Sequence, residues 1–166
     1  MQEVSVIIPN YNGMAYLEGV LSSLEQQEFR NFETILVDNG SSDGSVAYVM
    51  GNYPWVHIIE LPDNFGFSRA VNEGIYAAKA PYVLLLNNDT EVERHFVGEM
   101  LAAIRRHKKA FSCSARMICY HDRDKLDDAG NYYCALGWAF ARGKGKDIHS
   151  YEKEDRIFTA CAGAAI

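Results

Sequence analysis

Short apolar segments alternate with amphipathic segments along residues 1–110. Between the apolar segments, hydrophobic residues recur at intervals of three and four, which is typical of helices that cover a sheet. Nearly continuous apolar runs of this length are typical of strands that are buried on both faces. The pattern therefore predicts the α/β class, with an open, mostly parallel sheet and helices on both of its faces. The expected strands are residues 4–8, 34–38, 56–61 and 82–87.

The start of each expected helix carries a local signal. Asn12 is expected to cap the first helix, and the second is expected to open at Ser42 or Asp43. The third helix is expected to begin near Ser68. Residues 90–93 fit the capping-box pattern, which predicts that the fourth helix begins there.

The regular alternation ends near residue 110. Residues 110–116 suggest one more strand, and the glycine-rich and aromatic stretch that follows predicts a loop with a hairpin around residues 131–143. We expect residues 1–166 to form a single domain with an irregular C-terminal part. The uncharged, small-residue run at residues 158–166 suggests that the chain is a truncated piece of a longer protein.

Composition narrows the possible functions. Of the 166 residues, 48% are hydrophobic and 23% are charged, which is enough apolar material for a packed core. The net charge of -6 argues against a nucleic-acid partner. The sequence has no apolar run of about 18 residues and no signal-peptide pattern, so no transmembrane segment is expected. The four cysteines form no C-x-x-C pair, and reduced thiols in a cytoplasmic protein are the simplest expectation.

Every expected strand is followed by Asn or Asp. In an open parallel sheet, ligands bind outside the carboxyl ends of the strands, so these residues predict a polar binding rim. The turn after the first strand, PNYNG, lacks the glycine pattern that cradles phosphates, and a bound diphosphate would need a divalent cation, Mg²⁺ or Mn²⁺, held by Asp89. The rim residues are Asn10, Asn12, Asp38, Asn39, Asp63, Asn64, Asn87, Asn88 and Asp89.

Four motifs in this order carry a family resemblance. The segments VSVIIPNYNG, ETILVDNGSSDGS, NFGFSRAVNEGI and LLLNNDTEV resemble successive motifs of family 2 glycosyltransferases, which have the GT-A fold. The resemblance covers residues 4–97, and the later segments DDAG and ACAGAAI resemble parts that border the acceptor side. LNNDTEV, DDAG and AGAA together resemble a branch that includes rhamnosyltransferases of bacterial surface polysaccharide synthesis.

The resemblance implies an activity. It implies inverting, metal-dependent transfer of a sugar from a UDP- or dTDP-linked donor to a polysaccharide, glycan or lipid-linked acceptor, with rhamnose as a candidate sugar. Residues 1–110 would form the nucleotide-sugar-binding half, and residues 111–166 would begin the acceptor-side half. The full-length protein would then work in the cytoplasm, at the inner face of the membrane. Two alternatives stay open: a nucleotide-sugar-binding module without turnover, and a nucleotidyltransferase, which PNYNG disfavours.

The resemblance also implies roles for individual residues. Asp38 would accept a hydrogen bond from the pyrimidine ring, and Asp89 would hold the metal. Asn87 stands where the family has the first acid of its D-x-D motif, so we expect weaker metal binding than two carboxylates would give. Many family members have Arg at the position of Val71, and Arg69 is not expected to replace it. The implied nucleotide-binding residues are Pro9, Asn10, Tyr11, Asp38, Asn64, Asn87 and Asn88.

The catalytic base has no matching residue in this chain. An inverting transferase needs a general base to deprotonate the acceptor hydroxyl. In the family that base lies beyond the segment seen here at residues 160–166, so the resemblance places it after Ile166. Asp127 is the one candidate within the chain. We therefore expect residues 1–166 to bind a nucleotide sugar and to turn it over poorly or not at all.

Overall fold

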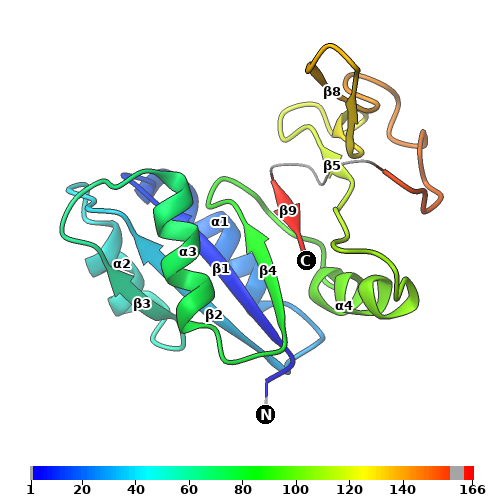
Figure 1. Ribbon diagram of the computed structural model, residues 1–166. Coiled ribbons are helices and arrows are strands. Elements are labelled where there is room, and N and C mark those ends of the chain that lie inside the picture. Colours follow the sequence, from blue (N-terminus) through cyan, green and yellow to red (C-terminus); the bar gives the residue numbers. More distant parts are fainter. Residues whose placement is uncertain (1, 158–162) are drawn as a thin grey trace. The chain divides into compact units, whose positions relative to one another are not determined.

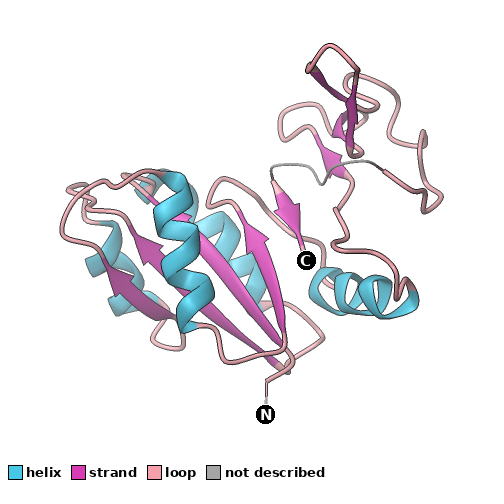
Figure 2. Cartoon of the chain, viewed as in Figure 1, coloured by secondary structure: helices cyan, strands magenta, loops and turns pink. Residues whose placement is uncertain are grey.

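The chain divides into two compact units in a computed structural model that describes residues 2–157 and 163–166. Unit 1 is Met1–Ala102 and unit 2 is Ala103–Ile166. Unit 1 holds long parallel strands with helices, whereas unit 2 holds short strands and loops (Figures 1 and 2). Whether the two units act as one domain, as the sequence suggests, stays a prediction.

The sheet of unit 1 is parallel and has helices on both faces. Its strands stand in the order β3-β2-β1-β4. Helix α3 lies on one face, with α1 and α2 on the other (Figure 1). The α/β prediction is therefore confirmed. The elements are β1 (Val4–Asn10), α1 (Met14–Glu25), β2 (Phe32–Asp38), α2 (Ser45–Asn52), β3 (His57–Glu60), α3 (Phe67–Ala77), β4 (Tyr82–Leu86) and α4 (Phe96–Arg106), which crosses into unit 2.

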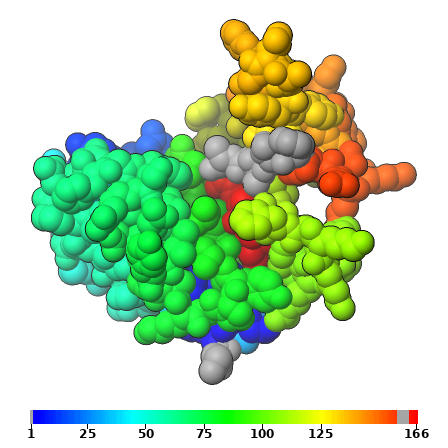
Figure 3. Space-filling view, viewed as in Figure 1, coloured from blue at the N-terminus to red at the C-terminus, as the bar shows by residue number. Residues whose placement is uncertain are grey.

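The apolar strands fill both faces of the sheet. Successive side chains of a strand point to opposite faces. On one face, Ile7, Ile35 and Val37 are fully buried and pack with Ala70 of α3. The alternate residues of β1, such as Val6, are fully buried as well. Burial on both sides explains why the sequence shows continuous apolar runs rather than alternation. In Figure 3, teal to green atoms of α3 and its flanking segments hide the strands behind them.

Two helix starts differ from the sequence-based expectation. Asn12 does not cap α1: it has a φ of 49° and its Oδ1 accepts a hydrogen bond from the N–H of Ser42 at 2.9 Å. Asp43 caps α1 from the neighbouring loop, because its Oδ2 accepts from the N–H of Met14 at 2.9 Å. The same carboxylate accepts from the N–H of Ser45 at 3.0 Å, at the start of α2. One aspartate therefore caps two helices. Helix α2 begins at Ser45, two residues after the expected Asp43, and it is the bond to the distant Met14 that local sequence patterns cannot reveal.

The capping-box prediction for the fourth helix is wrong. Helix α4 begins at Phe96, and Thr90 forms a turn instead, donating from its Oγ1 to the carbonyl oxygen of Asn87 at 2.7 Å. The buried side chain of Gln27 replaces the expected cap, since its Oε1 accepts from the N–H of Val97 at 3.0 Å. Its Nε2 also donates to the carbonyl oxygen of Glu93 at 2.7 Å. A distant residue thus positions α4.

Unit 2 contains short antiparallel ladders. The expected hairpin is confirmed, with β7 pairing with β8. The strand expected at residues 110–116 is not formed; Ser114 makes one isolated bridge, to Ala165. None of the helices in the described residues is long and apolar enough to cross a membrane. The elements are β5 (Met117–Ile118), β6 (Leu126–Asp128), β7 (Asn131–Tyr133), β8 (Ala139–Ala141) and β9 (Ala164–Ala165).

We predict that Gly74→Ala destabilises unit 1. A Cβ at this position would lie 2.4 Å from Cγ2 of Ile7 and 3.1 Å from Cγ2 of Val37, so α3 would have to move away from the sheet. Overpacking of this kind costs about 1–3 kcal/mol. The matched control is Gly51→Ala in α2, where nothing lies within 4 Å and the helix propensity of alanine should be neutral or stabilising. Urea unfolding measures both, and equal effects would contradict the close packing of α3.

We also predict that Asp43→Ala lowers the free energy of unfolding at pH 7 by about 1 kcal/mol, the usual effect of losing a helix cap. Burial opposes ionisation of this carboxyl, but hydrogen bonds from Ser45 and Met14 outweigh it and lower its pKa below 3.8. Because the folded-state pKa is lowered, the stabilisation is present above the unfolded pKa and is lost as pH falls through the folded pKa. Urea titrations at pH 7 and pH 3 should show the difference shrinking in acid; an equal difference at both pH values would contradict the double cap.

Candidate functional site

A cleft lies at the carboxyl ends of the parallel strands of unit 1. The chain runs outward from β1 to β2 and β3, and then crosses to β4 on the other side of β1, so the strand order reverses between β1 and β4. Ligands of open α/β sheets bind at such a switch point. The cleft measures about 390 Å³. Its lining residues are Pro9, Asn10, Tyr11, Asn39, Asn64, Gly66, Phe67, Ala70, Asn87, Asn88 and Asp89.

Most of the residues expected from the sequence come together in this cleft. Asn12, Asp38 and Asp63 of the expected rim do not line it, and Asp38 is 3% exposed. The sequence placed Asn39 on the polar rim but gave it no role. It did not predict that Gly66, Phe67 and Ala70 line the cleft. An aromatic residue at the very start of a helix, as at Phe67, was the available signal. The expected residues that line the cleft are Pro9, Asn10, Tyr11, Asn64, Asn87, Asn88 and Asp89.

A chain of hydrogen bonds joins the ends of β1, β2 and β4. Nδ2 of Asn88 donates to Oδ1 of Asn10 at 2.8 Å. Nδ2 of Asn10 donates to Oδ1 of Asp38 at 2.9 Å and to Oγ of Ser41 at 3.3 Å. Oδ2 of Asp38 accepts from the N–H of Ser41 at 2.9 Å. We call Asp38, Asn10 and Asn88 the amide relay; it spans the switch point between β1 and β4.

A second pair of amides shapes the β3 side of the cleft. Nδ2 of Asn39 donates to Oδ1 of Asn64 at 2.9 Å, and Oδ1 of Asn39 accepts from the N–H of Phe65 at 3.0 Å. Oδ1 of Asn64 also accepts from the N–H of Gly66 at 2.9 Å. These bonds fix the loop that leads from β3 into α3. The asparagines at the strand ends therefore brace the cleft as well as line it.

Two exposed aromatic side chains line the cleft. Tyr11 follows β1 and is 50% exposed, and Phe67 begins α3 and is 59% exposed. Exposed rings in a cleft offer flat apolar surfaces on which a planar base can stack. The sequence predicted this role for Tyr11 from the resemblance alone.

Among the described residues, Asp89 is the one charged residue that lines the cleft. Arg69 does not line the cleft; its Nη2 forms an ion pair with Glu73 at 2.6 Å. No group of three or more His, Cys, Asp or Glu residues in the described part of the chain could hold a metal ion. Mg²⁺ and Mn²⁺ are nevertheless commonly held by one or two carboxylates together with substrate phosphates. Asp89 therefore fits a cation that arrives with a diphosphate, not a preformed metal centre.

The candidate base, Asp127, lies in β6 of unit 2. Its Oδ1 forms an ion pair with Nζ of Lys144 at 3.2 Å, and its side chain is half exposed. Burial raises the pKa of the neighbouring Asp128; a hydrogen bond from the N–H of Gly130 acts in the opposite direction, and the charge of Asp127 adds to the rise. The ion pair with Lys144 occupies one oxygen of the Asp127 carboxylate.

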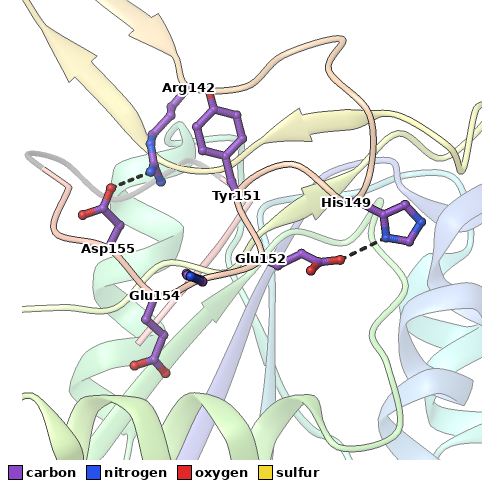
Figure 4. Close-up of a pocket in the computed structure, with 7 residues that line it drawn as sticks. Arg142, His149, Tyr151, Glu152, Glu154 and Asp155 are labelled. Carbon is purple, nitrogen blue, oxygen red and sulfur yellow. Dashed lines mark hydrogen bonds and ion pairs between the residues drawn. The ribbon is translucent and has the colours of Figure 1, made fainter.

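A second cavity, of about 520 Å³, lies within unit 2. Four of its lining residues form two charged pairs with one another. Nη2 of Arg142 lies 2.6 Å from Oδ2 of Asp155, and Nδ1 of His149 lies 3.0 Å from Oε1 of Glu152 (Figure 4). Groups that already have partners gain less from a ligand, so this cavity is the weaker candidate of the two.

Comparison with known proteins identifies the family. The model of glycosyl transferase family 2 matches residues 5–165, and the chain therefore belongs to this family. TuaG of Bacillus subtilis, named as a teichuronic acid biosynthesis glycosyltransferase, is 29% identical over 75% of the chain and 50% of its own length. Glycosyltransferase GlyG of Streptococcus pneumoniae is 28% identical over 78% of the chain and 42% of its own length.

A solved structure shares the fold. Residues 1–349 of TarS from S. aureus, crystallised with UDP-GlcNAc, match with a TM-score of 0.64 and 26% identity over 70% of the chain and 34% of that structure. The expected GT-A architecture is thus confirmed. The chain spans half of TuaG and about a third of that TarS structure.

Proposed function

We propose that the cleft at the ends of β1, β3 and β4 binds the nucleoside diphosphate of a sugar donor. The protein would transfer that sugar to a glycan or lipid-linked acceptor in the synthesis of a cell-surface polymer. The observation that carries this proposal is the convergence of the strand-end residues on one cleft. Its neutral amides suit ribose hydroxyls, its two aromatic rings suit a base, and its one carboxylate suits a cation on the diphosphate.

The comparisons support the donor class. TarS was crystallised with UDP and with UDP-GlcNAc, which favours a UDP-linked donor over a dTDP-linked one. The name of TuaG refers to teichuronic acid synthesis, which supports a cell-wall or surface polymer as the product. Transfer of rhamnose rests on the sequence resemblance alone.

Each group of lining residues has a part in the proposed chemistry. Tyr11 and Phe67 hold the base. The NH₂ group of Asn64 donates to a hydroxyl oxygen, because its own oxygen already accepts from Asn39 and Gly66, and the amide of Asn87 bonds a further hydroxyl group. Asp89 holds Mg²⁺ or Mn²⁺, which when bound offsets the negative charge that grows on the leaving diphosphate. A direct contact between Asp38 and the base stays a prediction, since Asp38 does not line the cleft.

The acceptor side completes the proposal. Inversion at the anomeric carbon requires a base on the face opposite the leaving group. Asp127 is already paired with Lys144, and the resemblance places the base after Ile166. The alternative function, a binding module without turnover, predicts the same nucleotide affinity and no sugar transfer by any longer form of the protein.

Isothermal titration of the chain with UDP and dTDP, with and without MnCl₂, tests the donor site. We expect UDP to bind and Mn²⁺ to tighten that binding by about tenfold or more, a usual size for coupling between two ligands. Because Asp89 is the only lining carboxylate, Mn²⁺ alone should bind weakly. Tight binding of Mn²⁺ without nucleotide, or no binding of either nucleotide, would contradict the proposed site.

Asp89→Ala should abolish the effect of Mn²⁺ while leaving part of the metal-free affinity for UDP. The reason is that the amides and aromatic rings of the cleft remain in place. Asp124→Ala removes an exposed aspartate that does not line the cleft, and it should behave as the unmodified chain. The same titrations measure both variants, and a manganese effect that survives Asp89→Ala would refute the role of Asp89.

A further inference from the structure

The hairpin of unit 2 ends in an apolar tip. Residues 134–138 join β7 to β8, and residues 134–141, which we call the apolar tip, read CALGWAFA. This stretch has no charged side chain and no hydroxyl or amide side chain. Turns between strands ordinarily carry Asn, Asp, Ser or Gly and face water. Here Leu136 is 85% exposed and Trp138 is 66% exposed, so large apolar side chains take that place.

Three aromatic rings share one face of this hairpin. Tyr132 pairs with Phe140 across the ladder, and residues that pair in this way point to the same side. Trp138 stands two residues before Phe140, and its carbonyl oxygen accepts from the N–H of Cys134 at 2.9 Å, which continues the ladder to it. Tyr132 is 54% exposed and Phe140 is 55% exposed. A contiguous exposed apolar surface of this kind marks an interaction site.

The composition of the tip favours lipid as the partner. A sugar or another polar ligand needs hydrogen-bonding groups placed among the rings, and the side chains of the tip supply almost none. A bilayer makes no such demand, because its acyl chains accept Leu and Phe side chains. Trp and Tyr are also the residues that concentrate at the boundary between the acyl chains and the headgroups.

Basic residues follow the tip directly. Arg142 lies beside the ring face, where its Nε donates to Oη of Tyr132 at 3.3 Å. Lys144 and Lys146 come next in the sequence RGKGK, and both are exposed. Lys144 pairs with Asp127, but both side chains of that pair are about half exposed or more. Exposed ion pairs are weak, so the phosphates of a lipid surface can compete for this lysine.

The charge of the whole unit has the same sign. Residues 103–166 contain 12 Lys and Arg against 8 Asp and Glu, whereas residues 1–102 contain 4 Lys and Arg against 14 Asp and Glu. An anionic lipid surface attracts basic segments that come close to it. Such a surface therefore attracts unit 2 and repels unit 1.

We propose that the apolar tip inserts into the surface of an anionic lipid bilayer, with Leu136, Trp138 and Phe140 at the upper ends of the acyl chains and Lys144 and Lys146 among the headgroup phosphates. The binding strength of such a contact grows with the buried apolar area and with the attraction to anionic lipids. The inference is independent of the proposed function, because it concerns unit 2 and needs no nucleotide. It would place a transferase at the surface that holds lipid-linked acceptors.

Tryptophan fluorescence tests insertion directly. The chain has two tryptophans, so Trp55→Phe leaves Trp138 as the single reporter. With vesicles of equal parts phosphatidylcholine and phosphatidylglycerol, its emission should shift to shorter wavelength, and lipids brominated on their acyl chains should quench it. Vesicles of phosphatidylcholine alone should bind about tenfold more weakly or less well still, because they lack the negative charge. Unchanged emission with the anionic vesicles would overturn the proposal.

Phe140→Ala should weaken binding to the anionic vesicles by about tenfold, the effect of losing one buried aromatic side chain. The matched control is Phe111→Ala, which removes the same exposed side chain from unit 2 outside the hairpin. Sedimentation with vesicles measures both variants, and circular dichroism should show that both keep the unmodified fold. Equal losses in the two variants would show non-specific adsorption and would overturn the role of the tip.

Paired lysine variants test the charges. Lys144→Gln with Lys146→Gln should weaken binding to the anionic vesicles by about tenfold or more and should not change binding to neutral ones. Lys108→Gln with Lys109→Gln removes two exposed charges from the basic run at residues 105–109 and should change binding by less than about threefold. A larger loss in this second pair would assign the lipid contact to the basic run and not to the hairpin.

Other partners for the tip give different results. If a second copy covers it, sedimentation without lipid shows a dimer that Trp138→Ala converts to a monomer, and the proposal is overturned. If the remainder of a longer protein covers it, acrylamide fails to quench Trp138 in that longer form without vesicles, which overturns it as well. Ready quenching by acrylamide, with protection gained on adding the anionic vesicles, is the result that we expect.

Discussion

The bond between Asn10 and Asn88 crosses the point where the strand order of the sheet reverses, and the geometry of the cleft depends on it. In a parallel sheet ordered β3-β2-β1-β4 the strand order reverses between β1 and β4, and a ligand-binding gap forms at the carboxyl ends of these two strands. Such a gap accommodates a ligand only if its walls hold their positions. Here a hydrogen bond of 2.8 Å between two side-chain amides joins the walls, and Gly13 provides the space for it.

The same constraint explains why the site is rich in asparagine. An amide both donates and accepts hydrogen bonds, so neighbouring amides can bond to one another. Here Asn88 donates to Asn10, and Asn10 donates to the buried carboxylate of Asp38. No Lys or Arg side chain is among the described residues that line the cleft, and the nearby Arg69 is paired with Glu73. A diphosphate would therefore depend on a metal ion for its counter-charge, and Asp89 is the lining residue that could hold one.

The fold of unit 1 could be predicted because its signals are local and repeated. Continuous apolar runs at β1, β2 and β4 and helical spacing between them specify a parallel sheet, and the position of Asn and Asp after each run specifies its ligand edge. The features that were missed depend on contacts between distant residues. Asp43 caps α1 from another loop, Gln27 sets the start of α4, and Phe67 enters the cleft only because α3 begins there. The sequence placed Asp38 at the ligand edge because it stands at a strand end. That position did not show how deeply its side chain is buried.

The central claim is that one nucleoside diphosphate and one cation occupy the cleft together, with the cation bound to the Asp89 carboxylate. A crystal structure of the chain grown with UDP and MnCl₂ tests it most directly, since manganese can be located by its anomalous scattering. We expect an anomalous peak at coordination distance from both the Asp89 carboxylate and the diphosphate, with the base beside Tyr11 or Phe67. A nucleotide bound in the cavity of unit 2, or manganese bound to the diphosphate away from Asp89, would contradict the claim.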